Sequence, residues 1–190
     1  MKSLTALLTL TAFLMLLYSG CTAENLTSTL EEDAPHELQL ATADVKGSAS
    51  LNKRLAALRA LVAPLHNFER AKTAGWSEQI TDCFEDPTQG GMGFHYGNPQ
   101  FLFDAEANEF EPEALLFEPQ KNGKMRLIGV EYIVLFDFLP PDADPPVLFD
   151  REMQPNHDAG LWALHAWVGR HNPSGMFADW NPKVNCDHAP

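Results

Sequence analysis

MRLIGVEYIVLFD, residues 125–137, is the stretch that decides the fold. Side chains alternate between two faces along a strand. One face here carries Leu127 and Glu131, and the other carries Ile128, Val130 and Tyr132. Because both faces are largely apolar, we expect this strand at the centre of a sheet. Glu131 should then be buried, and a buried carboxylate needs a cation, a metal ion or several hydrogen bonds.

Short β-like runs surround this strand and are separated by Gly, Pro, Asn and Asp residues. This pattern predicts an antiparallel sheet rather than alternating strands and helices. Asn122-Gly123 is a strong hairpin signal and predicts a turn that joins a strand over 114–118 to the central one. Further strands are expected at 92–96, 147–149 and 161–169, with surface loops at 139–146 and 154–160.

A helical pattern precedes the strands. Leu51, Leu55 and Leu58 begin an apolar stripe at helical spacing. Pro64 should kink or split the helix, and Gly75 should end it. We therefore predict an α+β domain in which an N-terminal, amphipathic, Pro-kinked helix packs on a mainly antiparallel sheet. A partly closed barrel is the alternative form of that sheet.

The N-terminus is typical of a targeting segment. Lys2 is followed by an apolar run over 4–17 that is too short for a stable transmembrane helix. Ser19-Gly20-Cys21 resembles the lipobox of bacterial lipoproteins, although Tyr18 stands where Leu is usual. We expect 1–20 to be a signal peptide and Cys21 to carry palmitate and other lipid; ordinary cleavage or a retained apolar anchor is the alternative. The protein would then be exported and lipid-anchored to a bacterial membrane, facing the periplasm or the cell exterior.

The rest of the chain divides into two parts by composition. Residues 21–50 are polar and acidic and predict a disordered linker, whereas 51–190 suit a single globular domain. In an oxidising compartment, Cys83 and Cys186 predict one disulfide that closes a loop of about 100 residues. Free thiols or metal ligands are the alternative. The net charge of -13 excludes nucleic acid as a natural partner, because phosphates are neutralised by Lys and Arg.

Three potential ligands lie in strands that are dense with apolar residues: His95, Glu131 and His165. Two imidazoles and one carboxylate are a common set of protein ligands for zinc or iron, with positions left open for water or substrate. The same groups would serve acid–base chemistry. His171 follows a strand end and is a weaker candidate ligand.

A purely structural role for these residues is the competing interpretation. A histidine on a strand is usually a satisfied core residue, and Glu131 could pair with Arg126, Arg151 or Arg170. The sequence contains no HExxH, HxH or GxSxG pattern and no phosphate loop. Convergence of the three groups is therefore a prediction about the fold.

Several motifs in order resemble a family of exported bacterial proteins of unknown function. They are GMGFHYGNP from Gly91, PEALLFEP from Pro112, RLIGVEYIV from Arg126 and LHAWVGRHNPSGMF from Leu164. That family carries MGxHY, PExLLYEP, GVEY and LHxWxxxxNPxGxF, and often a further histidine before the last motif, where this chain has Leu161-Trp162. The resemblance implies an exported globular domain and supplies no function.

Three functions stay open. The first is a cell-envelope binding module that holds a metal ion or small molecule at His95, Glu131 and His165, beside the aromatic residues Trp162, Trp167 and Tyr132. The second is a metal-dependent envelope enzyme that uses the same residues. The third is a structural or interaction lipoprotein without a catalytic site.

Overall fold

The computed structural model describes residues 36–190, with side chains from residue 47 onward. The chain divides into two units after Ala43, and the second, Asp44–Pro190, is compact and contains the sheet. The predicted signal peptide, Cys21 and the first part of the predicted linker lie outside the described residues. Within the described residues, no helix has both the length and the apolar character needed to cross a bilayer.

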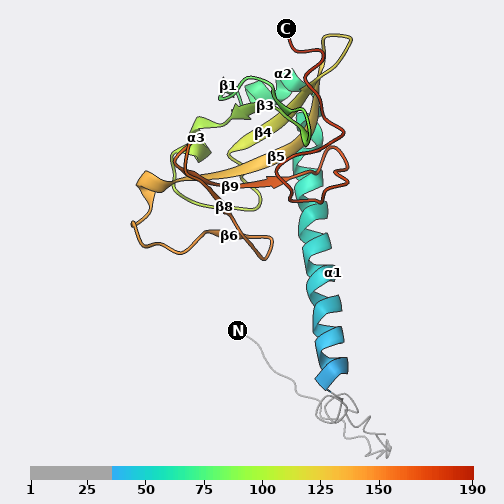
Figure 1. Cartoon of the computed structure of the whole chain (residues 1–190), viewed down its shortest axis with the longest axis vertical. Coiled ribbons are helices and arrows are strands. Elements are labelled where there is room, and N and C mark those ends of the chain that lie inside the picture. The colour runs from blue at the N-terminus through green and yellow to red at the C-terminus, as the bar shows by residue number, and fades with distance from the viewer. Residues whose placement is uncertain (1–35) are drawn as a thin grey trace, which may run out of the picture. The chain divides into compact units, whose positions relative to one another are not determined.

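The core of the second unit is an open antiparallel sheet with the strand order β1-β3-β4-β5-β9-β8 (Figure 1). These strands are β1 (Glu78–Gln79), β3 (Gly90–Gly97), β4 (Ala114–Pro119), β5 (Met125–Leu135), β9 (Leu161–Ala166) and β8 (Gln154–Asn156). β2 (Phe84–Asp86) also pairs with β3, and β6 (Val147–Leu148) forms a separate hairpin with β7 (Arg151–Glu152). The α+β prediction is confirmed. The barrel alternative is wrong, because the outer strands β1 and β8 do not pair with each other in the described part of the chain.

The predicted break at Pro64 is confirmed. Helix α1 (His36–Val62) gives way to a 3₁₀ turn, η1 (Ala63–His66), which contains Pro64, and then to α2 (Phe68–Thr73). Gly75 follows with a φ of 118°, a conformation that favours glycine. The predicted helix start at Leu51 is too late. Part of the predicted linker is helical, since residues 37–46 are mostly Ala, Leu, Glu, Gln and other residues compatible with a helix.

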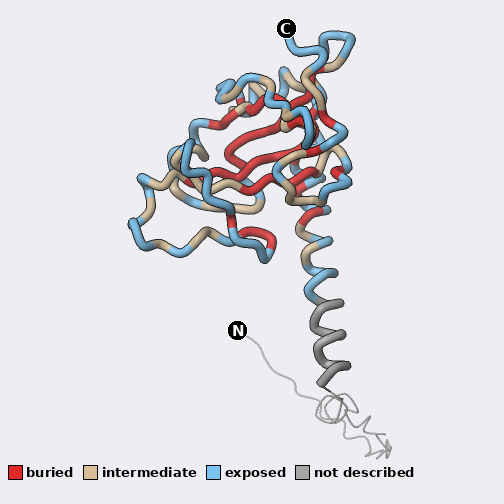
Figure 2. The backbone as a smooth tube through the Cα atoms, in the orientation of Figure 1, coloured by how far each residue is buried: buried red, intermediate tan, exposed pale blue. Residues whose placement is uncertain are grey.

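The C-terminal part of α1 packs on one face of the sheet. Leu55, Leu58 and Val62 of α1 belong to the same buried cluster as Phe117 of β4 and Tyr132 of β5. Figure 2 shows that the buried backbone is concentrated in the central strands. The central position predicted for β5 is confirmed, because β4 and β9 flank it.

The other face of the sheet is partly covered by the C-terminal segment. Trp167 and Val184 form a second buried cluster with Leu116 of β4 and Ile128 of β5. The predicted disulfide between Cys83 and Cys186 is present and joins residues 103 positions apart. It ties this segment to the chain just before β2.

Strict alternation along β5 holds only in part. Leu116 pairs with Gly129, but the next residue, Phe117, pairs with Leu127, so Ile128 is one residue too many on β5. This β-bulge turns Leu127 toward the helix-side cluster and Ile128 toward the opposite one. The expected grouping of Leu127 with Glu131, and of Ile128 with Val130, is therefore wrong.

Short elements account for the other differences from the expected strands. β8 lies in a segment expected to be a loop, and β1, β2 and β7 were not expected. β9 ends at Ala166, three residues early, because the Trp167 N–H donates to the Met176 carbonyl instead of continuing the ladder. After β5, the chain forms the turn η2 (Phe136–Phe138). A short helix, α3 (Pro99–Leu102), follows β3.

Candidate metal site

Strand register brings the three predicted ligands to one face of the sheet. Glu131 on β5 is directly opposite His165 on β9, so their side chains project from the same side. His95 lies on β3, two strands away from β5, which corresponds to about 10 Å between the backbones. Ala114 of β4 pairs with Glu131 between them, and its methyl group leaves room for the two longer side chains to meet.

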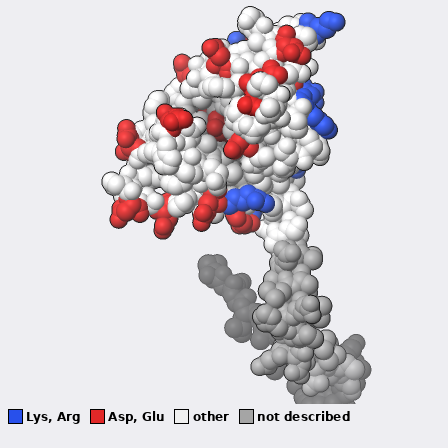
Figure 3. All heavy atoms as spheres, viewed as in Figure 1, with Lys and Arg blue, Asp and Glu red and all other residues white. Residues whose placement is uncertain are grey.

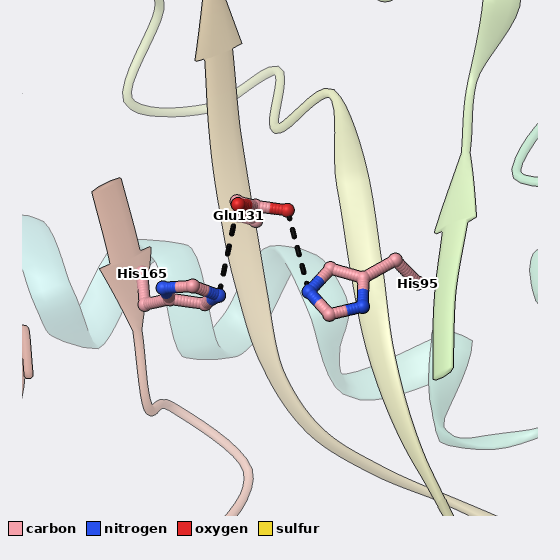
Figure 4. A group of neighbouring side chains, drawn as sticks. All are labelled: His95, Glu131 and His165. Carbon is pink, nitrogen blue, oxygen red and sulfur yellow. Dashed lines mark ion pairs between the residues drawn. The ribbon is translucent and has the colours of Figure 1, made fainter. Parts of the chain in front are cut away.

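The two imidazoles approach the Glu131 carboxylate from opposite sides (Figure 4). His95 Nε2 lies 3.4 Å from Oε2, and His165 Nε2 lies 3.7 Å from Oε1. One potential ligand atom from each residue lies within 4.8 Å of the other two, and all three residues are buried. The prediction that these residues converge is confirmed.

These separations suit a shared ion better than direct hydrogen bonds. Hydrogen bonds between such atoms are shorter, at about 2.7–3.2 Å. Ligand atoms bound tetrahedrally to one zinc ion at about 2.0–2.2 Å are about 3.3–3.6 Å apart, so small movements would complete the site. Neither ring nitrogen of His165 has a hydrogen-bond partner among the described residues. An unpaired buried polar group costs about 1–3 kcal/mol, and an ion at Nε2 would offset part of that cost.

Each histidine has an oxygen beside its second ring nitrogen. Thr81 Oγ1 lies 2.8 Å from His95 Nδ1 and accepts the His95 backbone N–H at 3.2 Å. Asp179 Oδ1 lies 3.8 Å from His165 Nδ1. Metal-binding histidines usually direct their second nitrogen to such an oxygen, which leaves the other nitrogen free for the ion. The ring of His165 also stacks on Trp167, with 6.0 Å between the ring centroids.

Burial and charge act differently on the two histidines. Burial lowers the pKa of His95 to about 4, and the opposing effect of Glu131 is too small to restore it. Burial also acts to lower the pKa of His165, but the carboxylates of Glu131 and Asp179 together raise it above its usual value. His95 is therefore a neutral imidazole that is ready to act as a ligand. On His165 a proton and a metal ion would compete for Nε2.

A cavity of about 540 Å³ lies over the cluster. His95 and Glu131 form part of its lining, whereas most of the remaining wall is apolar. The floor is formed by β3 and β5. The walls come from the segment between β1 and β2, from α3, from the chain around β8 and β9, and from Trp180. This volume is in the range of small-molecule sites, and the cavity reaches the two ligands directly.

Not every residue expected at the site is there. His171 is exposed and lies outside the cluster, because the chain leaves the sheet after Ala166. Of the aromatic residues expected beside the site, Trp167 contacts His165. Tyr132 instead belongs to the helix-side core, and Trp162 packs on Phe136.

The arginines that the competing structural interpretation offered as partners of Glu131 are not at the site. Arg170 forms an ion pair with Glu118, a second buried carboxylate. No ion pair joins Glu131 to Arg126 or Arg151 among the described residues. Glu131 is therefore paired only with the two histidines in this part of the chain.

Sequence reasoning missed Thr81 and Asp179, which gave no local signal because they reach the site from loops.

It also missed Glu113, whose side chain is almost fully buried. Glu113 Oε2 accepts the Ile133 backbone N–H at 2.9 Å, and burial raises its pKa from the ordinary 4.5 to about 8. The signal was present in PEALLFEP, where a glutamate stands at each end of an apolar run.

Comparison with known proteins adds no name to this geometry. No protein-family model matches the chain, and neither the curated proteins nor the solved structures give a match. The resemblance to an exported bacterial family stays a prediction. A fold by itself does not define an activity, so the function depends on the chemistry of the site.

Proposed function

We propose that this domain binds one divalent transition-metal ion, zinc or iron, through His95, Glu131 and His165. We further propose that it does so as an exported lipoprotein of the cell envelope, anchored through Cys21. Zinc and iron both accept sets of two imidazoles and one carboxylate.

One observation carries the metal proposal: three buried ligand atoms from three different strands converge without closing into hydrogen bonds. A core built only for stability would pair these groups, because an unpaired polar group in the interior is costly. The oxygens of Thr81 and Asp179 behind the two rings support the same conclusion.

The acidic surface also favours a cation. Asp and Glu side chains are spread over the face drawn in Figure 3, where Lys and Arg are few. With a formal net charge of -13, the chain attracts positive ions and repels polyanions.

A metal-dependent hydrolase or oxygenase is the second candidate, and the cavity favours it. Three protein ligands leave coordination positions open, and the cavity reaches His95 and Glu131 from the solvent side. A substrate in the cavity would therefore lie next to the ion. The same arrangement suits reversible binding, which requires no chemistry.

The test is metal content. The chain is expressed without a histidine tag, exported to an oxidising compartment and analysed for metals by mass spectrometry. We expect close to one zinc or iron per chain, with strong loss in His95→Ala and in His165→Ala. His171→Ala is the matched control and should retain the ion. A wild-type protein that carries no metal and takes none up from zinc, iron or copper solutions would refute the proposal.

A further inference from the structure

The cavity over the three ligands differs from the ligands themselves in character. Its wall contains Ile80, Leu102, Ile133, Leu135 and Leu161, and its polar members besides His95 and Glu131 are Thr81 and Asn156. No Lys or Arg stands among its described lining residues. A ligand that occupied this space would therefore be apolar over most of its surface.

The exposed part of the cavity lining, its mouth, is mostly apolar as well. Phe84 and Phe103 line it and are 50% and 66% exposed. Large aromatic side chains that stay in water next to an apolar cavity favour the entry of an apolar molecule, since they lose water contact when it binds.

The net charge of the metal ion and its protein ligands, at the inner end of the cavity, determines which polar group a bound apolar molecule should carry. A divalent ion bound by two neutral imidazoles and the Glu131 carboxylate leaves one net positive charge. In an apolar cavity that charge is poorly solvated, and Glu131 is the one acidic side chain among the lining residues that the structure describes. A ligand with a single negative charge that binds the open coordination positions would neutralise it.

We propose that the cavity binds an apolar monocarboxylate, with its carboxylate on the metal ion and its hydrocarbon body along the cavity wall. This inference rests on the proposed metal site. A phosphate or sulfate ester does not fit as well, because its additional oxygens would meet an apolar wall without cationic donors.

Cobalt(II) provides the test, because it accepts the same ligands as zinc and has visible absorption bands that change with coordination. The full chain is loaded with cobalt, its metal content is measured, and the bands are followed during titration with octanoate, acetate and octanol. We expect octanoate to shift the bands at a concentration at least about tenfold lower than acetate, since its longer hydrocarbon chain is buried. Octanol should bind more weakly than octanoate because it brings no charge.

A cavity-filling variant distinguishes the contribution of the cavity wall to binding from that of the metal ion. Leu161→Trp should remove the advantage of octanoate over acetate while cobalt content and the response to acetate persist. Val147→Trp is the control, since Val147 is exposed and outside the cavity. Equal affinities for octanoate and acetate, or for octanoate and octanol, in a protein that holds cobalt would overturn this inference and leave the metal site standing. A protein that holds no cobalt at these residues would overturn both.

Discussion

The buried carboxyl of Glu113 makes a sharp prediction about stability and pH. Its pKa is raised to about 8 in the folded protein, chiefly by burial, against an ordinary 4.5. The folded state therefore holds a proton that the unfolded state releases. Stability from this group is fully present below about pH 4.5 and is lost as the pH rises toward 8.

The linkage relation gives the magnitude. Between about pH 5.5 and pH 7.5 the unfolded carboxyl is ionised and the folded one mostly is not, which corresponds to about 2–3 kcal/mol of lost stability. Glu113→Gln keeps the shape and an oxygen that can accept the Ile133 N–H at the same place. The glutamine side chain does not titrate in this range, so the unfolding free energy of the variant should not fall by this amount as the pH rises.

The assay is urea unfolding followed by tryptophan fluorescence, with the disulfide intact and a chelator present. The quantity to compare is the difference in unfolding free energy between Glu113→Gln and the wild type. Contributions from His95 and His165 largely cancel in that difference. We expect it to change by about 2–3 kcal/mol in favour of the variant from about pH 5.5 to pH 7.5. Parallel profiles for the two proteins would refute the argument that Glu113 is protonated in the core.

Three further sets of variants test the alanine beside the site, the disulfide and the second buried carboxylate. Ala114→Leu should abolish stoichiometric metal uptake measured by mass spectrometry, because it fills the space between His95 and Glu131, whereas Ala114→Ser should retain it; equal uptake in both would contradict this. Replacing Cys83 and Cys186 by Ser should lower the unfolding free energy by up to about 4–5 kcal/mol in urea, and an unchanged midpoint would show that the bridge adds nothing. Arg170→Met leaves the buried Glu118 carboxylate without its cation and should cost about 3–5 kcal/mol in the same assay. Adding Glu118→Gln should recover part of that loss, and no recovery would argue against the ion pair.

The central strand shows why much of the fold could be predicted. Apolar residues on both faces of 125–137 require cover on both sides, and Asn122-Gly123 fixes an antiparallel neighbour. Pro64 and Gly75 acted as expected because their backbone restrictions are local. The bulge at Ile128 and the early end of β9 depend on partners far away in the sequence, so no local pattern indicated them.

The site follows the same division. Glu131 and His165 were predictable because a polar residue in an apolar strand demands a partner, and period-2 alternation gave their faces. The sequence does not show that Glu131 pairs directly with His165, or that His95 meets Glu131 across β4. Both depend on the register between the strands. Thr81 and Asp179 arrive from loops, where no periodicity indicates direction.

The most direct test of the central claim is a crystal of the zinc-loaded protein measured at the zinc absorption edge. The account predicts one strong anomalous peak within about 2.0–2.2 Å of His95 Nε2, of His165 Nε2 and of a Glu131 carboxylate oxygen. A zinc-containing crystal with its peak elsewhere, and with Glu131 hydrogen-bonded directly to both histidines, would contradict it. The cluster would then be a polar core rather than a metal site.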